Sequence, residues 1–277
     1  MQSQSFFAGA LLLALAATSC STGPAPPKPG TPAFNWAAAK ENYRAGDFPK
    51  TDATLVDIIR TDNEFSARAR AWDMVLSAGM AQGFSQLADS YEAGGRANRA
   101  NPTPFHKQVT ALRSNASAAA IELVETSRAF LEKDKDPNVL LAFEYPRGAA
   151  AEPGSLKRVA GGIVILDAEA ETLQTAMLQR GVLLSVCRAA GAADDPAKTL
   201  EKFKGEVLVP RDVFLLAAAK ALQEQSELFT ANKLDQPTRQ KLLCQQALDV
   251  LHAIPETKET KALTTKIQTT MKKIRGA

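Results

Sequence analysis

Residue types that could support catalysis are few in this sequence, and they form no familiar pattern. Neither histidine, His106 or His252, is paired with the Cys, Ser or Asp of a nucleophilic triad. The acidic residues form three close pairs: Asp134 with Asp136, Glu169 with Glu171, and Asp194 with Asp195. We expect these pairs in loops, at helix caps or on a helix surface, without an acid or base function. The sequence therefore predicts no catalytic residue, no metal site and no cofactor.

Two cysteines lie far from the N-terminus, Cys187 and Cys244, and both fall on the apolar faces of predicted helices. Two interpretations stay open for them. In an exported protein they could form a disulfide, and otherwise they are buried free thiols. The sequence alone cannot place two sulfur atoms within bonding geometry.

The first twenty residues are typical of an export signal. An apolar run from Phe6 to Ala17 is too short to cross a bilayer and ends in small residues before Cys20. The Ala-Thr-Ser-Cys segment that ends at Cys20 resembles a bacterial lipobox, which implies that residues 1–19 are removed and that Cys20 carries a lipid. The alternative is ordinary signal cleavage after Ala16 or Ala17, which would leave Cys20 as a plain thiol.

Residues 20–32 predict a spacer between this anchor and the folded part. They lack an apolar pattern and are rich in proline: Pro24, Pro26, Pro27, Pro29 and Pro32. At ~3.1 Å per residue, such a tether would hold the domain roughly 30–40 Å from the membrane. Ser21 after the Cys resembles the lipoproteins that are sorted to the outer membrane. We therefore expect a lipid-anchored protein of the cell envelope, on the outer membrane and facing the periplasm.

The stretch from Trp36 to Phe48 predicts a helix, a tight turn and a second helix. Aromatic residues recur on one helical face, a glycine then tolerates a left-handed turn, and an aspartate can cap the next helix. This pattern resembles the tetratricopeptide repeat, and the residues that carry the resemblance are Trp36, Tyr43, Gly46, Asp47 and Phe48. The match covers one unit, Trp36 to Asn63. It implies antiparallel helical hairpins, stacked as a solenoid or a helical bundle over residues 33–277.

Apolar residues three or four positions apart predict helices through the rest of this all-α chain. The expected ranges are 65–93, 105–133, 167–190, 196–204, 212–231, 236–253 and 256–274. Residues 139–143 are expected to form a short helical turn, and residues 207–210 an extended segment. Gly79 and Gly83 inside the first range predict a kink or a close helix crossing. The segment from Tyr91 to Gly94 echoes the first hairpin and hints at a second repeat.

The segment from Val159 to Leu166 could form either a buried strand or a helix, because it is rich in β-branched residues. We expect a helix, since a helical pattern follows it and no partner strand is evident elsewhere. At the C-terminus, the apolar stripe of Leu263, Ile267, Met271 and Ile274 predicts a capping helix. A membrane-surface helix has a similar pattern, but it usually includes Trp or Phe.

Gly94 to Pro104 is the clearest predicted loop, and basic residues surround it: Arg96, Arg99, Lys107 and Arg113. This basic patch could meet an anionic partner such as lipid headgroups, a cell-wall polymer or an acidic protein. The alternative is a solvated loop with no partner.

Composition and architecture together narrow the function. A net charge of +3 over 277 residues gives no argument for nucleic-acid binding, and 23% charged residues are too many for a mostly membrane-embedded chain. Helical stacks commonly serve as recognition surfaces, so we expect a non-enzymatic binding or scaffold module for a protein or small-ligand partner in the envelope. The alternative is a cell-envelope enzyme whose site is built from dispersed polar residues.

Overall fold

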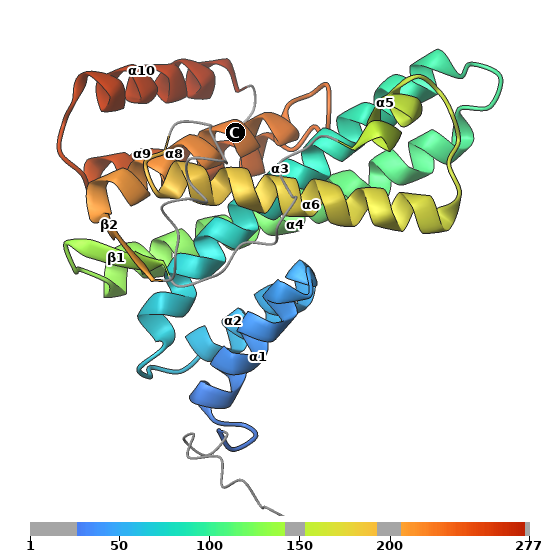
Figure 1. The fold of residues 1–277 in the computed structure, drawn as a ribbon. Helices are drawn as coiled ribbons and strands as arrows, with labels where there is room; N and C mark the ends of the chain where they lie inside the picture. Colours follow the sequence, from blue (N-terminus) through green and yellow to red (C-terminus); the bar gives the residue numbers. More distant parts are fainter. Residues whose placement is uncertain (1–26, 142–152, 193–205, 275–277) are drawn as a thin grey trace, which may run out of the picture.

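Two very long antiparallel helices form the centre of the molecule, α3 (Ser66–Ala97) and α4 (Thr103–Lys133) (Figure 1). The computed structural model describes residues 27–141, 153–192 and 206–274. The other elements pack around this long hairpin, and a single core of buried aliphatic and aromatic side chains connects them. The all-α fold predicted from the sequence is therefore confirmed, apart from one short two-stranded ribbon.

The turn between α3 and α4 starts later than expected. Gly94 and Gly95 are buried within α3, and the turn begins at Asn98, whose amide nitrogen donates to the Gly94 carbonyl. Gly94 is required because a β-carbon there would lie 2.2 Å from the carbonyl oxygen of Val159. The second repeat that the segment from Tyr91 to Gly94 hinted at is wrong, because α3 continues through this segment without a turn. This single helix has 32 residues, nearly the length of a whole two-helix repeat of about 34 residues.

The first helical hairpin forms as predicted, from α1 (Pro32–Arg44) and α2 (Phe48–Ile59). Gly46 adopts a φ of +77°, and the Asp47 side chain accepts a hydrogen bond from the Lys50 amide at 3.2 Å. The folded part begins at Pro32, one residue before the expected boundary, because this proline occupies the first position of α1.

A close crossing joins α3 to α6 (Asp167–Ala189). A β-carbon added to Gly181 would lie 2.2 Å from the Gly79 carbonyl oxygen, and one added to Gly83 would lie 2.8 Å from the Met177 oxygen. The predicted crossing at Gly79 and Gly83 is thus confirmed. The helix expected over 159–166 is wrong, because α5 (Gly154–Ala160) ends at Ala160 and the segment from Gly161 up to α6 is neither helix nor strand.

The C-terminal third packs against α3, α4 and α6 (Figure 1). Its elements are α8 (Arg211–Ser226), the 3-10 turn η1 (Glu227–Phe229), α9 (Pro237–His252) and α10 (Lys258–Lys273). The three helices predicted here are confirmed. Ile267 is fully buried as α10 packs on α9 and α8, which agrees with the capping function predicted for the last helix. The helix predicted over 196–204 lies outside the described residues.

The ribbon consists of β1 (Asn138–Leu141) and β2 (Val207–Pro210), which pair antiparallel with Val139 opposite Val209. The extended segment at 207–210 was predicted, but the helical turn at 139–143 is wrong, since β1 occupies its first part. Val139 and Val209 point to the core, whereas Leu208 is 66% exposed on the outer face.

Candidate functional site

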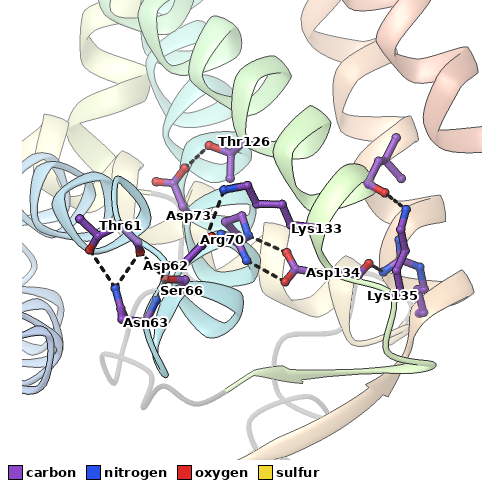
Figure 2. Close-up of polar contacts among 12 residues, drawn as sticks. Thr61, Asp62, Asn63, Ser66, Arg70, Asp73, Thr126, Lys133, Asp134 and Lys135 are labelled. Atoms are coloured by element: carbon purple, nitrogen blue, oxygen red, sulfur yellow. Dashed lines mark hydrogen bonds and ion pairs between the residues drawn. The ribbon is translucent and has the colours of Figure 1, made fainter.

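A polar network lies where the end of α4 meets α3 and the ribbon, and its centre is an ion pair between Arg70 and Asp134 (Figure 2). The guanidinium Nε and Nη2 atoms donate to the two carboxylate oxygens at 2.6 and 2.9 Å. The two side chains are only 5% and 10% exposed. A two-point contact of this kind fixes the orientation of both groups, so Asp134 is held where α4 ends and the chain turns toward β1.

Arg211 directly follows β2, at the start of α8, and its side chain contacts Asp134 at the end of α4. Its guanidinium donates to the main-chain oxygen of Asp134 and lies 4.9 Å from the centre of the Phe130 ring. Its amide nitrogen also donates to the Pro137 oxygen at 2.9 Å. Burial lowers the pKa of Arg211, while the charges of Asp134 and Asp136 act in the opposite direction. Arg70 therefore joins α3 to the end of α4, and Arg211 joins the residue that follows β2 to the same place.

A cleft of about 260 Å³ opens beside this network. Both strands contribute to its wall through Leu140 and Leu208, and Phe130 and Ala71 add apolar surface. Charged side chains of both signs complete the lining: Glu64, Arg68, Asp134, Asp136 and Arg211. We call this feature the ribbon cleft.

A second polar cluster lies one turn further along α3, where α2 meets the long hairpin. Asp73 is fully buried and accepts a hydrogen bond from the Thr126 hydroxyl at 2.5 Å (Figure 2). Its other neighbour is the carboxyl group of Asp52 on α2. Burial raises the pKa of Asp73 well above its usual range, and the negative charge of Asp52 raises it further.

Asp52 and Asp73 form a coupled carboxyl pair. Burial also raises the pKa of Asp52, although the neighbouring Asp73 and Ser77 groups act in the opposite direction. The Oδ1 atoms of both aspartates have no hydrogen-bond partner among the described residues, so a proton shared between the two carboxyl groups would satisfy them. Glu122 on α4 is a third acidic neighbour, and burial followed by the charge of Asp52 raises its pKa.

The residues that resemble a tetratricopeptide repeat come together as an aromatic cluster. Trp36 and Tyr43 lie edge-on to Trp72 of α3, with ring centres 5.3 and 5.2 Å apart, and Phe48 contacts Tyr43 at 5.5 Å. Their predicted packing function is confirmed. Asn63, at the position of the usual repeat proline, instead holds the turn into α3 through side-chain hydrogen bonds of 2.9 Å with Ile58, Thr61 and Phe65.

The predicted basic patch is smaller than the sequence suggested. Arg113 is buried and forms an ion pair with Glu92 at 3.1 Å, so this residue is wrongly assigned to the patch. Arg96 also contacts Glu92, at 2.9 Å. Arg99 and Lys107 are exposed near the turn between α3 and α4. Among the described residues, two of the four basic side chains of the patch, Arg99 and Lys107, thus remain without an acidic partner, and the other two are paired with Glu92.

Of the two interpretations left open for Cys187 and Cys244, the structure supports buried thiols and not a disulfide. Both side chains are buried and no bond joins them. Cys187 is on α6 and Cys244 on α9, and α8 packs against both of these helices. Burial raises the pKa of the Cys244 thiol, as expected for an inert buried group. Cys20 lies outside the described residues.

Sequence reasoning missed both polar clusters. Asp134 was assigned to a loop or cap, which is correct, but its partner Arg70 is 64 residues away in the chain and has no sequence signal. Asp52 and Asp73 sit within apolar helical patterns, where a lone aspartate looks like a surface residue. Within the described ranges, no three His, Cys, Asp or Glu side chains are arranged to hold a metal ion.

Comparison of the chain with protein-family models, with curated proteins and with solved structures finds no match.

Proposed function

We propose that this chain is a lipid-anchored protein of the bacterial cell envelope that acts as a non-enzymatic helical binding or scaffold module. The observation that carries the proposal is the ribbon cleft, which we infer to be the surface for a protein partner. Its wall combines exposed aliphatic side chains with charges of both signs, a composition that suits a peptide segment.

The ribbon offers a second means of recognition. Each strand has only one strand neighbour in the described part of the chain, so β1 and β2 each keep one edge without a strand partner. An extended peptide can add to such an edge through main-chain hydrogen bonds, while side-chain pockets supply specificity. The exposed Leu208 and the half-buried Leu140 face each other on the outer face beside these edges.

The anchor rests on the N-terminal sequence, where an apolar run and small residues precede Cys20. Among the helices that the structure describes, none is both long enough and apolar enough to cross a membrane. Lipidation at Cys20 and the proline-rich tether would leave the domain mobile relative to the membrane and within reach of envelope partners.

One observation favours the alternative, an envelope enzyme. The Asp52 and Asp73 carboxyl groups form a coupled pair, and such pairs serve acid–base catalysis in some enzymes. However, Asp73 has no exposed surface and is enclosed by α2, α3 and α4. A substrate would reach the pair only if the α1–α2 hairpin moved, whereas the ribbon cleft is open without any movement.

The proposal is tested by cross-linking the tagged full chain in its native envelope and identifying captured proteins by mass spectrometry. We expect a reproducible partner that is lost with Cys20→Ala and falls about tenfold with Leu208→Ser, an effect equivalent to ~1.4 kcal/mol. Leu242→Ser is the matched control, because Leu242 is also an exposed leucine but lies on α9, away from the cleft. Equal capture by both leucine variants would contradict the assignment of the cleft.

A further inference from the structure

Three aliphatic side chains are exposed on the connection between α5 and α6, residues 161–166, which we call the apolar loop. Ile163 and Val164 are 48% and 51% exposed. Leu166 is 79% exposed, more than any other large hydrophobic side chain in the described part of the chain. Only Ile165 packs against the core. Single exposed aliphatic residues are common on protein surfaces, whereas a group of them in one segment usually marks an interaction site.

The apolar loop is held in a defined conformation. The Ile163 amide donates to the Arg158 carbonyl at 3.0 Å, and Gly162 adopts a φ of +86°. The side-chain amide of Asn98 donates to the Gly162 oxygen at 3.0 Å, which joins the loop to the turn between α3 and α4. Because the loop is already ordered, it loses little conformational entropy when its side chains are buried against a partner.

Basic residues surround the apolar loop at this end of the long hairpin (Figure 1). Arg99 lies in the turn between α3 and α4, Lys107 near the start of α4, and Lys157 on α5. All three side chains are exposed, and none has an acidic partner among the described residues. Asp167 and Glu171 of α6 are exposed carboxylates nearby, and they offset this positive charge only in part.

We propose that the apolar loop and the three basic side chains form a docking surface for a membrane that contains anionic lipids. The aliphatic side chains enter the boundary between headgroups and acyl chains, and the cations contact the lipid phosphates. The position of the loop at the outer edge of the molecule favours a bilayer as the partner (Figure 1). A protein partner would need a matching apolar groove, whereas a bilayer accepts any projecting apolar segment.

This surface is independent of the lipid at Cys20 and of the ribbon cleft, which lies at the other end of the long hairpin (Figure 1). The test uses the chain from residue 21 onward, without signal and lipid, because the described helices and their core begin only at Pro32. Co-sedimentation is measured with vesicles of phosphatidylcholine alone and of phosphatidylcholine with an equal part of phosphatidylglycerol. We expect binding to the anionic vesicles to be at least about tenfold tighter and to weaken as sodium chloride is added.

Single substitutions make the test specific to the loop, and circular dichroism checks that each variant is folded. Leu166→Ser should weaken binding to the anionic vesicles by about tenfold, because less apolar surface is buried. Leu242→Ser is the matched control on α9 and should change binding by less than about twofold. Lys157→Gln should weaken binding by about fivefold, and Asp167→Asn should strengthen it, because a repulsive charge is removed.

Three results would overturn the proposal: no binding to the anionic vesicles, equal binding to both kinds of vesicle, or equal losses for the two leucine variants. Analytical ultracentrifugation tests the other possible occupant, a second copy of this chain. A dimer that Leu166→Ser disrupts, together with no vesicle binding, would assign the apolar loop to self-association instead.

Discussion

The molecule contains two polar regions that differ in burial and in whether their charges meet a partner inside the protein. At the ribbon, Arg70 and Asp134 are buried and neutralise each other in a two-point contact, and Arg211 adds a further hydrogen bond. In the unpaired region at the start of α6, Asp167 and Glu171 are exposed to solvent and meet no cation among the described residues. A buried charge needs a partner inside the protein, whereas an exposed carboxylate is stabilised by water.

The largest expected effect comes from breaking the paired region. Replacing Arg70 with Met leaves the Asp134 carboxylate buried without its counter-ion, so we expect a loss of about 3–5 kcal/mol in the free energy of unfolding. The measurement is chemical denaturation of the purified variant. Lys133→Met is the matched control, because Lys133 pairs with Asp62 on the surface at 3.3 Å and should cost less than about 1 kcal/mol. Similar losses for both variants would show that burial of the pair is unimportant.

The next effect concerns the close crossing that positions α6 on α3. A β-carbon at Gly181 would meet main-chain atoms of α3, which cannot move as a flexible side chain can. We expect Gly181→Ala to destabilise the protein by about 1–3 kcal/mol, even though alanine favours a helix over glycine. Gly154→Ala should cause no loss, since nothing lies within 4 Å of the added atom. An unchanged melting temperature for Gly181→Ala would contradict the close crossing.

The Asp52–Asp73 pair should make stability fall as the pH rises. The pKa values of both groups are raised in the folded protein, so the folded state holds more protons than the unfolded state above about pH 4, where free aspartate titrates. The stabilisation is complete below that pH and is lost as the pH increases through the folded-state pKa values. Thermal melts of the wild type and Asp73→Asn from pH 4 to pH 8 should show a smaller decline in the variant. Parallel curves would contradict a shared proton.

The smallest effect on stability is expected in the unpaired region. Asp167→Asn combined with Glu171→Gln removes charges that contact no protein cation, so the free energy of unfolding should change by less than about 1 kcal/mol. A small loss is expected because Asp167 is the first residue of α6, where its negative charge interacts favourably with the positive end of the helix dipole. Chemical denaturation checks this value, and a loss similar to that of Arg70→Met would remove the distinction between the two regions.

The sequence predicted local features well and distant pairings poorly. Helical spacing located most of the helices, and the turn at Gly46 and Asp47 was correct because both residues act on their own neighbours. The ribbon was missed because β1 is only 4 residues long and its partner lies more than sixty residues away. The Val159 to Leu166 segment was misjudged because Gly161 and Gly162, with a φ of +86° at Gly162, end α5 before the apolar run.

In the candidate sites too, local features could be predicted from the sequence and long-range contacts could not. The spacing of Trp36 and Tyr43 within one helix indicates that both side chains pack on the same face, so their packing could be predicted. Arg70 and Asp73 acquire their properties from partners on other segments of the chain. A polar side chain that forms a long-range contact has no local sequence pattern that distinguishes it from a polar side chain on the surface. Arg113 illustrates the reverse, since a predicted surface cation proved to be buried beside Glu92.

The most direct test of the contrast between paired and unpaired charges is the free energy of unfolding of three proteins, measured by chemical denaturation at constant ionic strength. Relative to the wild type, we predict a loss of about 3–5 kcal/mol for Arg70→Met, because it leaves the buried Asp134 carboxylate without its counter-ion. We predict a change of less than about 1 kcal/mol for Asp167→Asn with Glu171→Gln, because both carboxylates are exposed to solvent. Losses of similar size in the two variants would contradict the account.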